Sequence, residues 1–102
     1  MIHVIATIEV APGKRNEFLT EFRRIIPLVR AEAGCLEYDP TVEMAAELPV
    51  QVPCRENVAV IVEKWESLDA LRAHMAAPHM QDYRVRVKDL VVRVQLQLLE
   101  PA

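Results

Sequence analysis

Residues 58–80 read VAVIVEKWESLDALRAHMAAPHM, and this stretch decides the fold because a strand and two helix starts follow one another in it. Its first eight residues are apolar at both alternating sets of positions, which predicts a strand covered on both faces. Ser67 is a favourable N-cap for the helix that follows. Pro78 suits the first turn of a further short helix. A tryptophan and two histidines, His74 and His79, therefore come close together along the chain.

The segments on either side of this stretch complete a βαββαβ order. Alternating apolar residues predict strands at residues 2–10 and 90–99. Apolar positions at helical spacing predict a helix from about Lys14 to Gly34, followed by a short strand at 35–38. Right-handed crossovers turn this order into a four-stranded antiparallel sheet with both main helices on one face. The expected fold class is therefore α+β, a ferredoxin-like sandwich.

Residues 41–57 interrupt this pattern. Pro49 and Pro53 argue against a central strand there, although residues 48–52 could form an edge piece. We therefore expect an irregular insertion between the second and third strands.

The predicted strands assign residues to two sheet faces. The helices are expected to cover the face that carries Val4, Ala6, Ile8, Val60, Val62, Val94 and Leu96. The opposite face, expected to lack a lid, carries Ile5, Thr7, Ile61, Glu63 and Trp65. A ligand cavity, a second subunit or both are expected to cover that face.

Composition limits the classes of partner. A chain of 102 residues is expected to form one domain. Apolar residues make up 52% of it and aromatic residues only 5%, so the surplus is aliphatic. A homodimer would bury the apolar surface that this surplus creates. The net charge of −3, with basic residues spread along the chain, argues against nucleic acid. No apolar segment is long enough for a membrane span, and the first residues lack signal-peptide features, so the expected location is the cytoplasm. No third ligand accompanies His74 and His79 at a suitable spacing, so no metal site is expected.

Three pieces of the chain resemble the antibiotic biosynthesis monooxygenase domain family. They are an opening strand that runs into Pro12-Gly13-Lys14, the segment from Ala31 through Gly34-Cys35-Leu36 to Tyr38, and Glu63-Lys64-Trp65-Glu66-Ser67 with the downstream Leu71, His74, Pro78 and His79. The resemblance implies a dimeric α/β barrel with an apolar pocket between sheet and helices in each subunit. It also implies oxidation of a quinol-like or polyphenolic small molecule by dioxygen without any cofactor.

The resemblance and the chemistry of the side chains together nominate site residues. His79 is expected to act as the proton acceptor, because an imidazole near neutral pH can deprotonate a phenol. Trp65 and Glu63 are expected to share the catalytic site. The expected substrate-binding residues are Tyr38, His74, Thr7 and Ile61.

Each nomination has a structural alternative. Trp65 is equally expected as a large core residue, and His79 as a side chain that hydrogen-bonds the neighbouring helix. For Glu63, an ion pair across the sheet with Arg93 or another basic group is the favoured structural role. At the level of function, the alternative is a non-catalytic or stress-response dimer of the same fold. Haem binding or degradation and small-molecule isomerisation, which also occur in the family, are less favoured.

Overall fold

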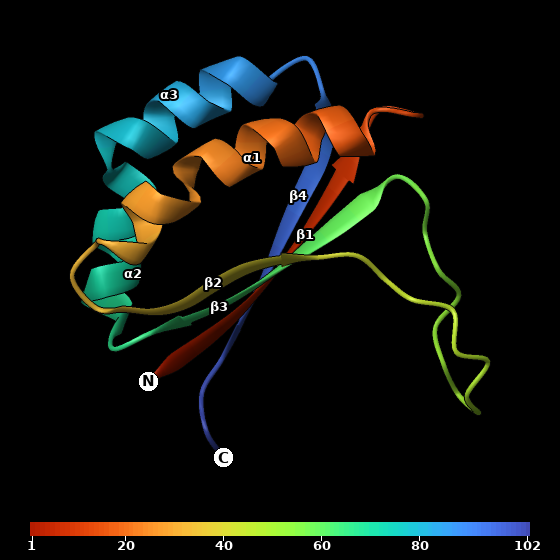
Figure 1. Ribbon diagram of the computed structural model, residues 1–102. Helices are drawn as coiled ribbons and strands as arrows, with labels where there is room; N and C mark the ends of the chain where they lie inside the picture. The colour runs from red at the N-terminus through yellow and green to blue at the C-terminus, as the bar shows by residue number, and fades with distance from the viewer.

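The computed structural model describes all 102 residues as three helices that lie over one sheet (Figure 1). The elements in chain order are β1 (Ile2–Val10), α1 (Arg15–Arg30), β2 (Cys35–Thr41), β3 (Val58–Trp65), α2 (Leu68–Ala76), α3 (Pro78–Val87) and β4 (Val91–Leu99). Both helix starts predicted from residues 58–80 are confirmed. Ser67 caps α2, since its Oγ accepts a hydrogen bond from the backbone N–H of Ala70 at 3.1 Å, and Pro78 is the first residue of α3.

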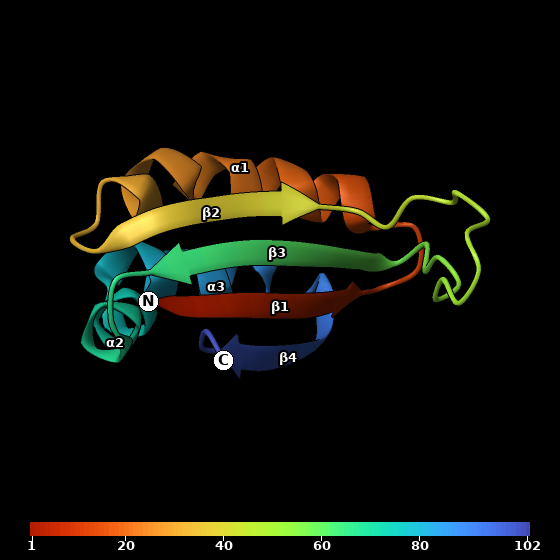
Figure 2. The same cartoon turned by 90° about the horizontal axis from the view of Figure 1, so that it is seen from below.

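The sheet has the strand order β2-β3-β1-β4, and every neighbouring pair is antiparallel. Figure 2 looks onto the face away from the helices and shows the four strands side by side with no element in front of them. This arrangement confirms the predicted ferredoxin-like βαββαβ fold. The helices leave one whole face of the sheet without a covering layer.

The predicted division of β3 between the two faces is wrong. Residues that stand directly opposite in an antiparallel pair share a face, and Ala6 pairs with Ile61 while Val4 pairs with Glu63. The helix side of β3 therefore carries Ala59, Ile61, Glu63 and Trp65, whereas Val60 and Val62 lie on the open face beside Thr7 and Ile5. Because β3 is apolar at both sets of positions, its sequence pattern does not say which set meets the helices.

The core forms between the helices and the helix side of the sheet. Phe18, Phe22 and Val29 of α1 are at most 1% exposed and belong to a cluster of 17 buried hydrophobic residues. In α2 the buried residues are Leu71 and His74. Leu68 and Met75, which the sequence pattern also places in the buried stripe of this helix, are 38% and 41% exposed and do not belong to it.

The insertion at 41–57 extends from the end of the sheet as an irregular arm (Figures 1 and 2). Strand β2 continues to Thr41, three residues further than predicted, and residues 48–52 form no strand. Side chains hold the arm in shape: Oε1 of Gln51 accepts hydrogen bonds from two backbone N–H groups, and the Arg55 guanidinium pairs with Glu43 at 3.0 Å. The predicted irregular insertion is therefore present, without the edge strand.

Strand β4 is the least covered part of the sheet. It forms one edge, and Val94, Leu96 and Leu98 on its helix side are 43–52% exposed. The helices therefore leave a gap between α3 and β4 on the covered side of the sheet. None of the three helices has the length and apolar composition that crossing a membrane requires.

Candidate active site

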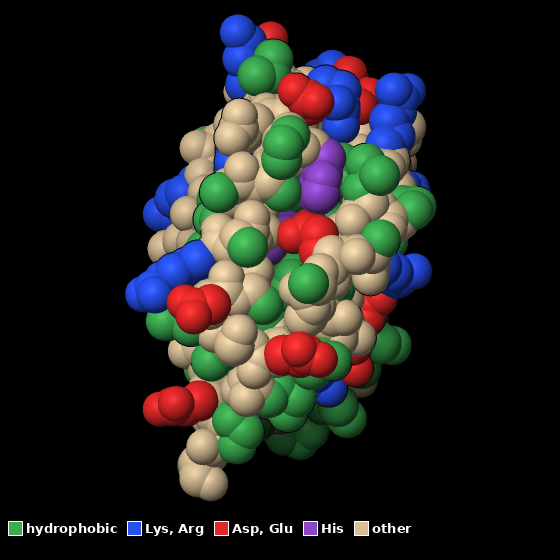
Figure 3. Space-filling model, turned by 90° about the vertical axis from the view of Figure 1, so that its left-hand side faces the viewer, with side chains coloured by type: hydrophobic (Ala, Val, Ile, Leu, Met, Phe, Trp, Pro, Cys, Tyr) green, Lys and Arg blue, Asp and Glu red, His purple; other side chains and the backbone are tan.

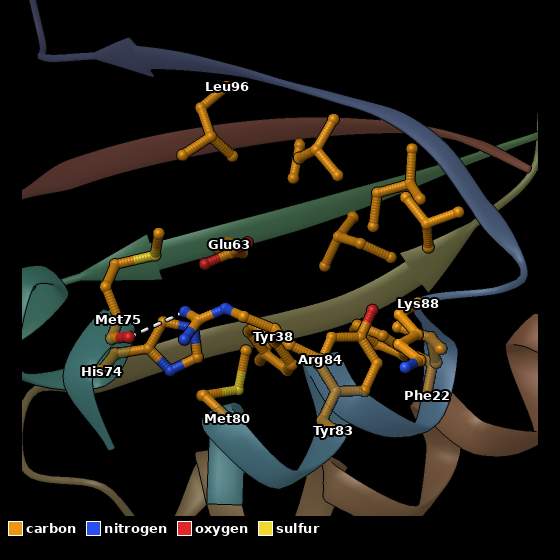
Figure 4. A pocket seen from close by; sticks show the side chains of 16 residues that line it. Phe22, Tyr38, Glu63, His74, Met75, Met80, Tyr83, Arg84, Lys88 and Leu96 are labelled. Carbon is orange, nitrogen blue, oxygen red and sulfur yellow. Dashed lines mark hydrogen bonds between the residues drawn. The ribbon is translucent and has the colours of Figure 1, made fainter. Parts of the chain in front are cut away.

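A cavity of about 460 Å³ lies in this gap, within the size range of small-molecule sites. Figure 4 shows side chains from the sheet and from the three helices converging on it. Twelve of its 16 lining residues are hydrophobic. The twelve include Tyr38 and Tyr83, whose hydroxyls are polar, and the other four are Glu63, His74, Arg84 and Lys88. The cavity is thus an apolar chamber with a few placed polar groups.

Glu63 is a buried carboxyl group in the wall of this chamber. It is 6% exposed, and its Oε1 accepts a hydrogen bond from the indole Nε1–H of Trp65 at 3.0 Å. Burial raises the pKa of Glu63 from 4.5 to about 7, with the hydrogen bond from Trp65 opposing the rise and the charge of Glu32 adding to it. Glu63 can therefore hold or release a proton near neutral pH.

His74 is the second buried ionisable group in the wall. It is 2% exposed, and its ring packs 4.6 Å from the Trp65 ring and 5.3 Å from the Tyr38 ring, measured between centroids. Its Nδ1 lies 3.0 Å from Oε2 of Glu32. Burial lowers the pKa of His74, while the hydrogen bond and charge of Glu32 oppose that change. The ring is therefore neutral at pH 7.

Two tyrosines complete the floor of the chamber. Tyr38 stacks on Phe22 with centroids 5.3 Å apart, and Tyr83 meets the same phenylalanine edge to face at 5.9 Å. Burial raises the pKa of both phenols, so both hydroxyls keep their protons. These groups can donate hydrogen bonds to an oxygen atom of a ligand.

Arg84 and Lys88 place positive charge at the mouth. Both are exposed residues at the end of α3 or just beyond it, and both line the cavity. The Arg84 guanidinium donates to the backbone carbonyl of Met75 at 2.7 Å, as the dashed line in Figure 4 shows. The sequence pattern indicates only a solvated helix face here, whereas the structure brings these cations to the cavity.

The structure places the seven predicted site residues differently. Four of them line the cavity: Tyr38, Ile61, Glu63 and His74. Trp65 is fully buried behind the wall, where it contacts Glu63 and His74 rather than the cavity. His79 is absent from the lining and is joined to His74 through Glu32. Thr7 pairs with Val60 on the open face of the sheet, away from the cavity.

Glu32 is the functional candidate that the sequence analysis missed. Its Oε2 lies 3.0 Å from Nδ1 of His74 and 2.8 Å from Nε2 of His79. Histidine and acidic side chains lie next to one another at this end of the molecule (Figure 3). One signal was available in the sequence, since a carboxylate in the last turn of the predicted helix is disfavoured by the helix dipole and so calls for a reason. No group of three or more His, Cys, Asp or Glu side chains is arranged so as to hold a metal ion.

Comparison with known proteins agrees with this architecture. Residues 1–86 match the model of the family described as antibiotic biosynthesis monooxygenase. The chain belongs to the antibiotic biosynthesis monooxygenase family. The resemblance inferred from the three sequence pieces is thereby confirmed.

Relatives of this family member cover its whole length. The probable quinol monooxygenase YgiN of Escherichia coli is 38% identical over 103 residues, which span 99% of this chain and 98% of YgiN. The crystal structure of PA3566 from Pseudomonas aeruginosa matches with a TM-score of 0.82 at 27% identity, covering 99% of this chain and 93% of PA3566. The structure of Rv0793 from Mycobacterium tuberculosis matches with a TM-score of 0.76 at 29% identity, covering 99% and 94%.

Proposed function

We propose that the chain is a cofactor-independent monooxygenase that oxidises a quinol-like or polyphenolic small molecule with dioxygen. The observation that carries this proposal is the apolar cavity with His74 and Glu63 in its wall. A planar aromatic substrate fits a chamber whose lining is mostly hydrophobic. The relative YgiN, named a probable quinol monooxygenase, supports the same substrate class.

The chemistry needs a proton acceptor and an anion-stabilising environment. A quinol becomes a much stronger reductant when one hydroxyl loses its proton, and a neutral imidazole near pH 7 can accept that proton. His74 meets this requirement from within the cavity wall, whereas His79, the acceptor expected from sequence, lies outside it. Arg84 and Lys88 at the mouth favour the quinolate anion electrostatically.

The substrate itself supplies all the electrons. The quinolate reduces dioxygen and the two combine at a ring carbon. Loss of water then leaves a hydroxyquinone with one new oxygen atom. The balance is quinol plus dioxygen to hydroxyquinone plus water, in which ring oxidation and C–H oxygenation each provide two electrons. The protein contributes binding, orientation and proton transfer.

The test is oxygen uptake with menadiol as the probe, compared with buffer alone because quinols also oxidise spontaneously. We expect faster consumption with protein, one ¹⁸O atom from ¹⁸O₂ in the hydroxyquinone, and loss of most of the acceleration in His74→Ala. Glu17→Ala, on an exposed part of α1, is the control and should match wild type. Equal rates with and without protein, or a product without ¹⁸O, would contradict the proposal.

A non-catalytic dimeric module is the second candidate. One feature favours it, since Trp65 is completely packed. A module of this kind is also expected to engage His79 with backbone groups, whereas His79 contacts the side-chain carboxylate of Glu32. A third expected feature, a filled cavity, is absent from the structure. Menadiol oxidation at the buffer rate combined with tight binding of aromatic ligands would favour the module.

A further inference from the structure

One carboxylate oxygen holds both imidazoles. Oε2 of Glu32 lies within 3.0 Å of a ring nitrogen of His74, from α2, and of His79, from α3. The side chain of Glu32 is 14% exposed, that of His74 2% and that of His79 23%. Glu32 therefore ties the segment between α1 and β2 to both helices beside the cavity.

The carboxylate of Glu32 determines which nitrogen of each imidazole ring carries a proton. An ionised carboxylate only accepts hydrogen bonds, so each nitrogen that faces it must carry a proton. For His74 this nitrogen is Nδ1. A neutral imidazole has one N–H, so Nε2 of His74 carries the free lone pair.

The lone pair is available to the cavity. The structure records a partner for Nδ1 of His74 and none for Nε2. Glu21 Oε2 is the sole buried side-chain nitrogen or oxygen that lacks a hydrogen-bond partner, so Nε2 is not sealed inside the protein. His74 lines the cavity, which is the open space next to its ring.

We propose that Glu32 is a positioning residue that holds His74 in the Nδ1–H tautomer and so presents the basic Nε2 to the substrate. This inference rests on the proposed function and names the residue that makes its proton acceptor competent. His79 is the second donor that fixes the direction of the Glu32 carboxylate. The sequence nominated His79 as the acceptor, and the proposal gives it this supporting role instead.

The same carboxylate stabilises the imidazolium that forms when His74 takes a proton. A negative charge at 3.0 Å favours the protonated ring. Two other ionisable groups around His74 lie on α3 and act in the opposite direction. The cationic Arg84 and a protonated His79 both disfavour the protonated form of the His74 ring. On the sheet, Tyr38 packs against the ring. Removing the charge of Glu32 must therefore make His74 a weaker base.

The first test reads the tautomer directly. In ¹⁵N spectra of the full-length protein above pH 7, we expect the shifts of His74 to show a protonated Nδ1 and an unprotonated Nε2. In Glu32→Gln this preference should weaken, because an amide can also donate and no longer requires a donor at Nδ1. Glu17→Gln, the same change at an exposed site of α1, should keep the wild-type shifts. A protonated Nε2 in the wild type would overturn the proposal.

The second test measures the basicity of His74 without an activity assay. Trp65 is the only tryptophan and contacts two titrating groups, His74 and Glu63. The measurement is therefore made in a Glu63→Gln background, where quenching of the Trp65 fluorescence by the protonated imidazole reports the titration of His74. We expect Glu32→Gln to move the midpoint to lower pH by about one unit, which corresponds to roughly a tenfold loss of basicity. An unchanged midpoint would overturn the proposal.

The third test is kinetic. With menadiol at pH 7 we expect Glu32→Gln to lower kcat about 10- to 100-fold with a change in KM of less than about twofold, as for other residues that orient a reacting imidazole. His79→Gln keeps an N–H donor toward Glu32 and should retain most of kcat. Loss of kcat in His79→Gln with an unchanged His74 tautomer would overturn the proposal in favour of His79 as the acceptor. If the wild type oxidises no quinol, the proposed function fails, while the ¹⁵N shifts and the fluorescence midpoint still decide whether Glu32 holds His74.

Discussion

Trp65 donates its indole N–H to the carboxyl group of Glu63 at 3.0 Å, from two positions further along the same strand face. The pair lies on the helix side of the sheet, where Glu63 reaches the cavity and Trp65 does not. The tryptophan therefore supports the wall of the site from behind. Its hydrogen bond partly compensates the carboxyl group for the loss of water.

The first prediction concerns the pH dependence of stability. The pKa of Glu63 is raised from 4.5 to about 7, so between these values the native state keeps a proton that the unfolded state has released. The stability that this proton provides is complete below about pH 4.5 and is lost as the pH rises through about 7. The Glu63→Gln variant does not lose stability in this way, because an amide does not ionise. Its free energy of unfolding relative to wild type should rise by roughly 2 to 3 kcal/mol between pH 4.5 and 8.

Urea unfolding at a series of pH values measures this difference. Glu17→Gln serves as the control, because Glu17 is an exposed carboxylate paired only with Lys14 on the surface. Its difference from wild type should stay nearly constant with pH. A constant difference for Glu63→Gln as well would contradict the raised pKa.

The second prediction separates the two roles of Trp65. Trp65→Phe keeps an aromatic ring but removes the donor, and the hydrogen bond to Trp65 is the influence that lowers the pKa of Glu63. The pKa of Glu63, followed by ¹³C NMR of its carboxyl carbon, should therefore rise above the wild-type value. The smaller ring and the unpaired carboxyl oxygen should cost about 3 kcal/mol of stability. A lower stability with an unchanged pKa would mean that the tryptophan acts only by packing.

The sequence predicted the elements more reliably than their contacts. Strands β1 and β3 match their predicted bounds because period-two alternation and flanking breakers are local signals. The orientation of β3 could not be predicted, since Val60 and Ile61 suit either face and only the register with β1 decides between them.

The candidate site, too, could be predicted from the sequence only in part. Tyr38, Glu63 and His74 were nominated from their chemistry and from the family resemblance, and the structure places all three around the cavity. Glu32 contacts two histidines that are 42 and 47 residues away along the chain. No local spacing reveals such a contact.

The third prediction concerns the open face of the sheet. Val60 and Val62 are half-buried there, and no element of the chain covers them (Figure 2). We expect a second copy of the chain to pack on this face, as the aliphatic surplus indicates. Val60→Lys should convert the dimer to a monomer, because it places an unpaired charge in an apolar interface.

Light scattering after gel filtration measures the mass of the particle in solution. Val85→Lys, at an exposed position of α3, should leave the dimer intact. A monomeric wild type would contradict the expectation.

The fourth prediction uses the two glycines as a matched pair. Gly13 and Gly34 both have positive φ, at 78° and 83°. A Cβ on Gly13 would meet nothing within 4 Å, whereas one on Gly34 would lie 2.6 Å from the Cβ of Ala70 in α2. Gly13→Ala should therefore cost only the backbone strain, about 1 kcal/mol of unfolding free energy. Gly34→Ala should cost about 2 kcal/mol more, because α2 must shift to relieve the overlap.

Because α2 carries His74, that shift should reach the candidate site. Chemical denaturation gives the two stability losses. The Trp65 fluorescence midpoint, measured with Glu63→Gln in place so that Glu63 does not titrate beside the indole, gives the environment of His74 in each variant. We expect the midpoint to move in Gly34→Ala and to stay at the wild-type value in Gly13→Ala. Equal stability losses and equal midpoints in the two variants would show that the close approach of Gly34 to α2 does not hold His74 in place.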